Sequence, residues 1–254
     1  AHSHSTGVIH NLFKALKFPI FMASKVPRKI AFILDGNRRF AKKLGLPPWK
    51  GHEFGVKKLE QLLEWCIELG IKELTLYCFS TENFKRAKTE IDYLFSLFWK
   101  EFEKMKTGKG IFKDKVKVNV IGRLNMFSKR MRDAMREAME KTKKNKALIV
   151  NFALAYGGRQ EITDAVKKIA KKVKEGRLKV EDVNENLITN NLYLKSEPDL
   201  LIRPGGEIRT SNFLTWQSIY SELAFIKKLW PEFTKQDLVK CIEEFNKRKR
   251  RFGT

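Results

Sequence analysis

The sequence predicts a single α/β domain: a mostly parallel β-sheet flanked by helices on both faces. Three observations indicate this fold class. Apolar strand-like runs alternate with amphipathic segments, the connections are short, and no repeat, linker or change of composition divides the chain. At 254 residues the chain can bury a sizeable core, and a hydrophobic fraction of 43% with 19 Phe argues against disorder.

The alternation runs from residue 28 to the last helix. Apolar runs predict strands at residues 29–35, 72–80, 115–122, 146–156, 198–204 and 222–226. Apolar residues three and four apart predict helices at residues 52–70, 90–105, 129–144, 160–176 and 235–251, with a further helix after residue 36. Ligands bind beyond the carboxyl ends of strands in such sheets, so the residues after each strand are the candidate site.

The balance of charge favours an anionic partner. There are 52 Lys+Arg and 29 Asp+Glu, a net charge of +23. Nucleic acid, an acidic membrane surface and phosphorylated substrates all fit, and so does a set of solvated lysine faces. Cys66, Cys78 and Cys241 lack metal-ligand spacing, which indicates buried free thiols and a reducing, cytoplasmic compartment.

The amino-terminal residues are expected to lie outside the core. Residues 1–7 resemble a tag remnant, so His2 and His4 are left out of metal arguments. Residues 8–27 form an amphipathic segment that either packs on the body or contacts a membrane surface peripherally. No apolar run is long enough to span a bilayer.

A carboxylate, a glycine and two arginines follow the first strand, in the order Asp35, Gly36, Asn37, Arg38, Arg39. Gly36 lets the backbone approach a ligand, and the next helix offers free N–H groups to a phosphate. Arg39 would add a bidentate contact, and Asp35 could hold Mg²⁺ against diphosphate oxygens. The structural alternative is that Asp35 caps the helix while the arginines face solvent.

The second strand ends in a similar group. Ser80, Asn83 and Arg86 are three residues apart and would share one face of a helical turn. The alternative is an ordinary helix cap, in which Ser80 or Thr81 has Glu82 as its partner.

A third group surrounds the Gly205–Gly206 turn. Arg203 and Arg209 flank this turn and precede Ser211, where the sequence predicts a helix start. Two separate anion cradles indicate two phosphorylated substrates. Neither a Walker A sequence nor a G-x-G-x-x-G fingerprint is present, so nucleotide use is not indicated.

These motifs resemble those of the cis-prenyltransferases, which include the undecaprenyl and dehydrodolichyl diphosphate synthases. The resemblance covers residues 28–253, so we expect the catalytic domain at residues 28–254. The DDxxD signature of the unrelated trans-prenyltransferases is absent. The matching motifs are Asp35-Gly36-Asn37-x-Arg39, Gly51-His52, Phe79-Ser80-x-Glu82-Asn83 with Arg86, Tyr156-Gly157-Gly158-Arg159 and Ile202-Arg203-x-Gly205-Gly206-Glu207-x-Arg209-x-Ser211.

The resemblance implies a homodimer with a hydrophobic tunnel between sheet and helices. It also implies Mg²⁺-dependent condensation of isopentenyl diphosphate onto farnesyl or geranylgeranyl diphosphate. The products would be pyrophosphate and a polyprenyl diphosphate for lipid glycan carriers. Phe95, Leu97, Phe98 and Phe102 either line the tunnel or belong to the core.

Site residues are carried over by position. The implied metal ligands are Asp35 and Glu222, and the implied catalytic residues are Asp35, Ser80, Asn83 and His52. The substrate-binding residues implied are Gly36, Asn37, Arg38, Arg39, Phe40, His52, Ser80, Thr81, Glu82, Asn83, Phe84, Arg86, Arg203, Arg209, Thr210, Ser211 and Arg251.

The last residues match the family's carboxyl-terminal R-x-G motif, with Arg251 expected to reach the diphosphate site across the dimer. Three departures stand out: Arg38 replaces a glycine, Ile208 stands where bacterial members often carry His, and an arginine before Gly51 is missing, with Lys50 as the candidate substitute. A noncatalytic scaffold relative would lack the Asp35 and arginine motifs. A nucleic-acid-binding protein would show a recognition motif, and none is present.

Overall fold

The computed structural model describes residues 26–107, 112 and 114–248. It contains a six-stranded sheet of order β3-β4-β2-β1-β5-β6 in which every neighbouring pair is parallel. The α/β fold predicted from the sequence is confirmed. The strands are β1 (Lys29–Ile33), β2 (Glu73–Ser80), β3 (Val116–Ile121), β4 (Leu148–Tyr156), β5 (Leu200–Pro204) and β6 (Glu222–Ile226).

The helices follow the predicted order, with one addition. The unpredicted helix is α7, a short polar segment whose first turn is capped by the side chain of Asn184. The helices are α2 (Asn37–Lys43), α3 (Gly51–Glu68), α4 (Lys88–Lys106), α5 (Lys129–Thr142), α6 (Gly158–Lys174), α7 (Glu185–Asn191) and α8 (Lys235–Lys247).

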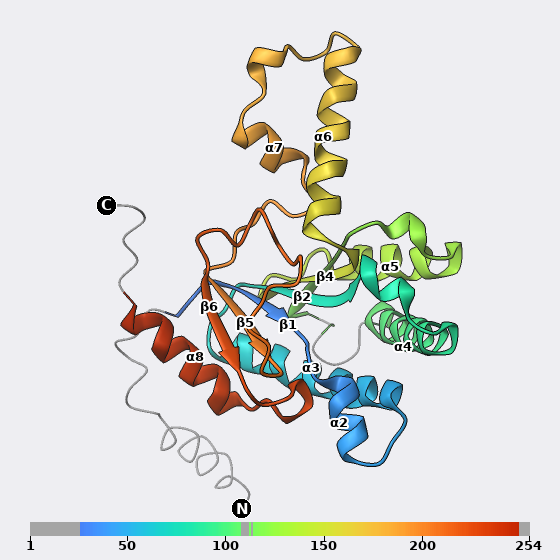
Figure 1. The fold of residues 1–254 in the computed structure, drawn as a ribbon, viewed down its shortest axis with the longest axis vertical. Helices are drawn as coiled ribbons and strands as arrows, with labels where there is room; N and C mark the ends of the chain where they lie inside the picture. The colour runs from blue at the N-terminus through green and yellow to red at the C-terminus, as the bar shows by residue number, and fades with distance from the viewer. Residues whose placement is uncertain (1–25, 108–111, 113, 249–254) are drawn as a thin grey trace, which may run out of the picture.

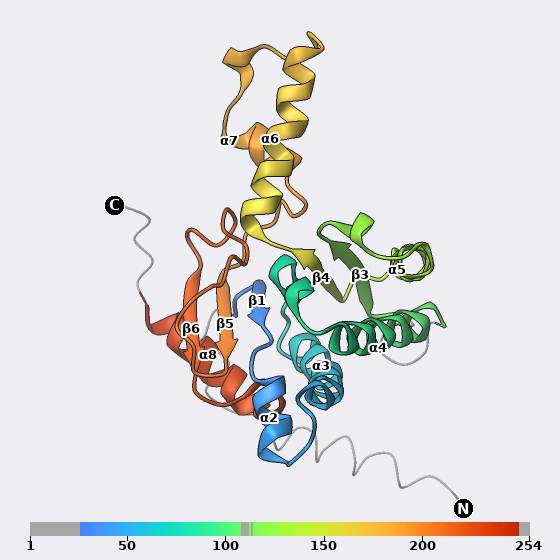
Figure 2. The same cartoon turned by 45° about the vertical axis from the view of Figure 1, so that its right-hand side comes forward.

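The two faces of the sheet are covered differently. Helices α3, α4, α5 and α8 pack on one face and bury the larger core, which includes Ile30 and Phe32 of β1. The alternate residues Ala31 and Ile33 face a smaller core that is closed chiefly by Leu194 and by the segment after β5. Helix α6 starts at the sheet and, with α7, projects away from it (Figures 1 and 2).

The strand register brings the candidate segments to one edge. Ile33 of β1 pairs with Tyr77 of β2, and Phe32 pairs with Ile202 of β5. The carboxyl ends of these three parallel strands therefore meet. Among the described helices, none is long and apolar enough to cross a membrane. Residues 1–25 of the amino-terminal part and the Arg251 motif lie outside the described residues, whereas Val26, in the last part of the 8–27 segment, packs against the larger core.

Candidate active site

The centre of the site is an ion pair between Asp35, just after β1, and Arg203 in β5. Arg203 Nη2 donates to Asp35 Oδ2 at 2.9 Å, and Arg39 Nη2 lies 3.1 Å from Asp35 Oδ1. The Arg203 side chain is 6% exposed, whereas that of Arg39 is 45% exposed. One carboxylate thus faces two guanidinium groups, and the excess positive charge suits a polyanionic ligand.

Two glycines allow this close approach. Gly36 and Gly205 have φ angles of +111° and +104°, in the region that disfavours side chains. A Cβ on Gly205 would lie 2.8 Å from Arg39 Nη2. Gly36 is the cap residue of α2, which has no side-chain capping bond. The alternative in which Asp35 caps the helix is therefore wrong, because the arginines engage its carboxylate.

A buried acid, Glu90, holds two more arginines at the site. Arg86 Nη1 donates to Glu90 Oε1 at 3.0 Å, and Arg38 Nε lies 3.7 Å from the same oxygen. Burial lowers the pKa of Arg86, although the Glu90 carboxylate offsets part of this effect. Glu90 is absent from the residues predicted above. The signal in the sequence is an acid four residues after Arg86, at the start of an apolar helix.

The segment after β2 is a 3₁₀ helix, Thr81–Lys85. Ser80 caps this segment, as the structural alternative expects, but its partner in the capping box is Asn83, whose Oδ1 accepts the Ser80 N–H at 2.9 Å. Glu82 instead accepts a hydrogen bond from Thr81 Oγ1 at 3.1 Å. Residues three apart fall on one face of a 3₁₀ turn. Ser80, Asn83 and Arg86 accordingly line the same cavity.

Arg203 also positions the second cradle. Its Nη1 donates to Ser211 Oγ at 2.8 Å and to the carbonyl of Arg209. Arg209 Nη1 donates to Glu207 Oε2 at 2.6 Å. The predicted helix start at Ser211 is wrong: in this fully described segment, residues 211–220 form turns, and Ser211 has a φ of +51°. A left-handed residue cannot continue an α-helix, so no helix dipole contributes here.

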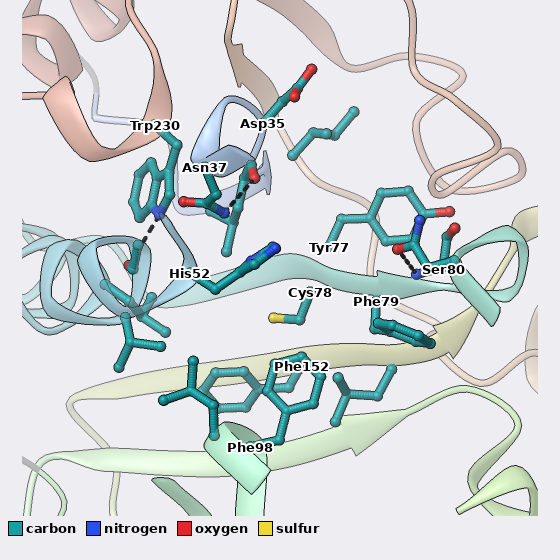
Figure 3. A pocket seen from close by; sticks show the side chains of 18 of the residues that line it. Asp35, Asn37, His52, Tyr77, Cys78, Phe79, Ser80, Phe98, Phe152 and Trp230 are labelled. Carbon is teal, nitrogen blue, oxygen red and sulfur yellow. Dashed lines mark hydrogen bonds between the residues drawn. The ribbon is translucent and has the colours of Figure 1, made fainter. Parts of the chain in front are cut away.

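The polar groups surround the mouth of a cavity of about 670 Å³. In Figure 3, Asp35 and Asn37 lie on one side of His52, and Phe98 and Phe152 lie on the other. The apolar lining comes from strands β2 and β4 and from helices α3 and α4. It includes Leu59, Leu63, Leu97, Phe98, Phe102, Met105, Phe152 and Leu154. A polar mouth above an apolar interior fits a ligand with an anionic head and a hydrocarbon tail.

The four tunnel candidates divide between cavity and core. Leu97, Phe98 and Phe102 line the cavity. Phe95 instead packs among aromatic rings, 4.9 Å from the ring of Phe127.

The sequence model of the family described as "Putative undecaprenyl diphosphate synthase" matches residues 33–253, which span both cradles and the cavity lining. The chain belongs to this family. It is a prenyltransferase, and the expected cis-prenyl diphosphate synthase fold and activity are borne out by its relatives.

Two curated relatives share the name tritrans,polycis-undecaprenyl-diphosphate synthase (geranylgeranyl-diphosphate specific). The protein of Pyrococcus abyssi is 50% identical over 96% of this chain and 93% of its own length. That of Methanopyrus kandleri is 48% identical over 90% of this chain and 85% of its own.

Two solved structures share the fold. Lavandulyl diphosphate synthase from Lavandula x intermedia, in complex with dimethylallyl diphosphate, has a TM-score of 0.85 and 34% identity, covering 90% of this chain and 99% of its own. A probable undecaprenyl diphosphate synthase from Campylobacter jejuni has a TM-score of 0.75 and 37% identity, covering 91% and 100%.

His52 of this prenyltransferase lies where the apolar cavity meets a second cavity of about 370 Å³. That smaller cavity is lined by residues 34–39, Lys42, His52 and Arg86. His52 Nε2 is buried and has no partner among the described residues. Burial, together with the charges of Arg86 and Arg38, lowers the pKa of His52 to about 4. The imidazole is therefore neutral at physiological pH, which leaves Nε2 free for a ligand.

Replacing His52 by Gln should weaken the acid sensitivity of folding. The pKa of His52 is about 4 in the folded protein against an ordinary 6.5. Between these values the unfolded chain binds the extra proton, so folded stability is lost as the pH falls from 6.5 toward 4. This difference in the pKa of His52 corresponds to a loss of roughly 3 kcal/mol in the free energy of unfolding once the pH is below both values. Urea unfolding measures the free energy of unfolding of both proteins at about pH 7.5 and 4.5. Between these pH values it should fall by roughly 2 kcal/mol less in the variant than in the wild type. Equal drops would contradict this.

The prenyltransferase chain does not bring Asp35 and Glu222 together. Glu222 opens β6 and pairs in register with Leu200 at the start of β5. It therefore lies at the amino edge of the parallel sheet, opposite to Asp35. Its carboxylate accepts a hydrogen bond from Arg248 Nη1 at 2.7 Å. Within one chain these two acids cannot share a metal ion.

Several other predicted contact residues lie outside both cavity linings. Lys50 Nζ donates to Glu53 at 3.1 Å. The Phe40 ring packs on Phe54 at 5.2 Å, and Phe84 belongs to the aromatic cluster around Phe79. Thr81 and Thr210 are also absent from the linings.

Proposed function

We propose that this prenyltransferase condenses isopentenyl diphosphate repeatedly onto geranylgeranyl diphosphate, giving a long-chain cis-polyprenyl diphosphate for lipid glycan carriers. The observation that carries the proposal is a single continuous cavity among the described residues, with an arginine-lined mouth and an apolar interior. The choice of geranylgeranyl over farnesyl diphosphate rests on the Pyrococcus and Methanopyrus relatives, whose names give geranylgeranyl diphosphate as their specific substrate.

The two cradles would hold the two diphosphates. The smaller cavity, lined by Gly36, Asn37, Arg38, Arg39 and Arg86, suits the allylic diphosphate because the hydrocarbon tail can pass His52 into the apolar cavity. The second cradle, built from Arg203, Arg209 and Ser211, would bind isopentenyl diphosphate.

Asp35 fits the role of the protein ligand to Mg²⁺. The described part of the chain holds no group of three His, Cys, Asp or Glu side chains that could form an all-protein metal site. Mg²⁺ does not need one, because one or two carboxylates together with substrate phosphates suffice. The Asp35 carboxylate lines both cavities, which is where a diphosphate would share an ion with it. When bound, Mg²⁺ would neutralise charge on the leaving pyrophosphate.

The arginines act on the charge that develops during the reaction. The allylic carbon–oxygen bond breaks as the new carbon–carbon bond forms, and negative charge builds on the departing pyrophosphate. Preorganised guanidinium groups at the mouth stabilise that charge without reorganising. The isopentenyl unit then loses a proton. Ser80, Asn83 and the neutral His52 line the cavity between the cradles and would position groups for that loss.

We extend the proposal to the assembly. The active form is a homodimer, in which Arg251 of one chain reaches the diphosphate site of the other. The dimer and the Arg251 contact follow from the resemblance described above. The segment at residues 8–27, which that resemblance does not cover, would pack on the body, with contact to a membrane surface as the alternative.

The test is product synthesis by the pure protein. We would incubate it with Mg²⁺, labelled isopentenyl diphosphate and either farnesyl or geranylgeranyl diphosphate, and then resolve the products by chain length. We expect a ladder that converges on a long product and is more efficient with geranylgeranyl diphosphate. A folded protein that incorporates no label with either starter would refute the proposal.

A further inference from the structure

The loop after the second cradle is held in an uncommon conformation. Ser211, Asn212 and Leu214 all have positive φ angles, between +47° and +65°. Such backbone persists only where its surroundings fix it. Ser211 belongs to the isopentenyl diphosphate cradle, so whatever fixes this loop also fixes the cradle.

Asn212 makes the fixing contacts. Its Oδ1 accepts the Arg159 N–H at 2.8 Å, and its carbonyl accepts the Gly158 N–H at 2.7 Å. Its Nδ2 donates to Gln160 Oε1 at 3.0 Å and to Glu82 Oε1 at 3.2 Å. Both amide hydrogens and the amide oxygen are therefore used within the protein. The side chain links the loop to the start of α6 and to the 3₁₀ segment after β2.

The Tyr156-Gly157-Gly158-Arg159 motif packs closely against this amide. A Cβ on Gly157 would lie 2.7 Å from Asn212 Nδ2 and 2.2 Å from Gln160 Oε1. Gly157 has a φ of −162°, an extended value that any residue can adopt. Backbone freedom does not explain a glycine here, whereas the close approach of Asn212 does.

We infer that Asn212 is a positioning residue: seated on the Gly157–Gly158 turn, it locks the isopentenyl diphosphate cradle to the Glu82 segment at the reacting centre. This inference rests on the proposed function, which assigns the substrate to that cradle. In the described part of the chain, the hydrogen bonds of Asn212 go to Glu82, Gly158, Arg159 and Gln160, and none goes to the Asp35–Arg39 cradle. Its loss therefore acts selectively on one of the two substrates.

Asn212→Ala should raise KM for isopentenyl diphosphate by about tenfold to a hundredfold, since it removes hydrogen bonds that include one to a charged group. KM for the allylic diphosphate should stay within about threefold of wild type, and kcat should fall less than KM rises. Asn125→Ala, at an exposed position of the 3₁₀ helix Leu124–Met126, is the matched control and should change neither KM. Gly157→Ala should also raise KM for isopentenyl diphosphate, because the added Cβ displaces the Asn212 side-chain amide.

A polarity swap separates positioning from a general structural role. Asn212→Asp keeps the acceptor for Arg159 but places a carboxylate against Glu82, so we expect an intermediate KM for isopentenyl diphosphate. Adding Glu82→Gln returns a donor to that contact. The double variant should bind isopentenyl diphosphate more tightly than Asn212→Asp does, and Glu82→Gln alone, measured in parallel, gives the direct effect of removing the Glu82 charge.

The outcomes are distinct. A KM for isopentenyl diphosphate within twofold of wild type in both Asn212→Ala and Gly157→Ala would overturn the inference, and so would an equal rise in both KM values. If the wild-type protein makes no product, the proposed function fails. Calorimetric binding of isopentenyl diphosphate to wild type and to Asn212→Ala then decides the inference, which requires a tenfold or larger loss of affinity.

Discussion

Asp35→Ala should abolish synthesis of the polyprenyl product, with a loss of at least about 10²–10³-fold in kcat. The substitution removes the only predicted metal ligand at the mouth. It also frees Arg203 and Arg39, which Asp35 contacts at 2.9 and 3.1 Å. Asp35→Asn preserves the shape and should be nearly as inactive, because a neutral amide is a poor ligand for Mg²⁺.

Steady-state incorporation of labelled isopentenyl diphosphate at saturating Mg²⁺ is the measurement. Asp92→Ala is the matched control, since this acid is 61% exposed on α4 and pairs with Lys88 on the surface. It should keep wild-type activity. If Asp35→Asn retained more than about a tenth of the wild-type rate, the negative charge of the Asp35 carboxylate would not be required for the reaction.

Arg203→Ala should raise KM for isopentenyl diphosphate by roughly a hundredfold and lower the free energy of unfolding by about 1–3 kcal/mol. Arg203 connects the two cradles, with Nη2 on Asp35 and Nη1 on Ser211 and the Arg209 carbonyl. Arg203→Lys should raise KM for isopentenyl diphosphate almost as much, because one ammonium group cannot contact all the acceptors that a planar guanidinium contacts at once.

Initial-rate kinetics with each substrate varied, alongside urea unfolding, check both parts. Arg136→Ala is the control for loss of an arginine. Its side chain is 72% exposed and pairs with Asp133 at 3.3 Å, a surface interaction of little worth. If Arg203→Lys bound isopentenyl diphosphate as tightly as wild type, the bridging role would be wrong.

The sequence could predict the sheet and the location of Asp35 and Arg203 near the carboxyl ends of strands, whereas their direct ion pair depends on the strand order that places β1 beside β5. Apolar runs marked the strands, and the carboxyl ends of neighbouring parallel strands must adjoin. The loop after Ser211 could not be predicted the same way. Its left-handed residues are held by Arg203 of β5 and by the start of α6, and the α6 contact joins positions that are 53 residues apart.

Two further gaps have physical causes. Glu90 looks like an ordinary first-turn acid until the fold buries it between Arg38 and Arg86. Glu222 was matched by position in the motif, which says nothing about where it lies in space. Strand register places it at the opposite edge of the sheet from Asp35.

The order of the strands also determines when, during synthesis of the chain, the active centre can form. Strand β1 is central, yet its partner β5 comes last but one, and Asp35 and Arg203 are separated by 168 positions. At ordinary rates of translation, about 10 to 30 s pass between the emergence of the two residues. During that interval one edge of β1 has no partner strand and invites pairing with other chains. The active centre is therefore completed late in synthesis, and a chain that ends after β4 would expose the edge of β1 that β5 covers.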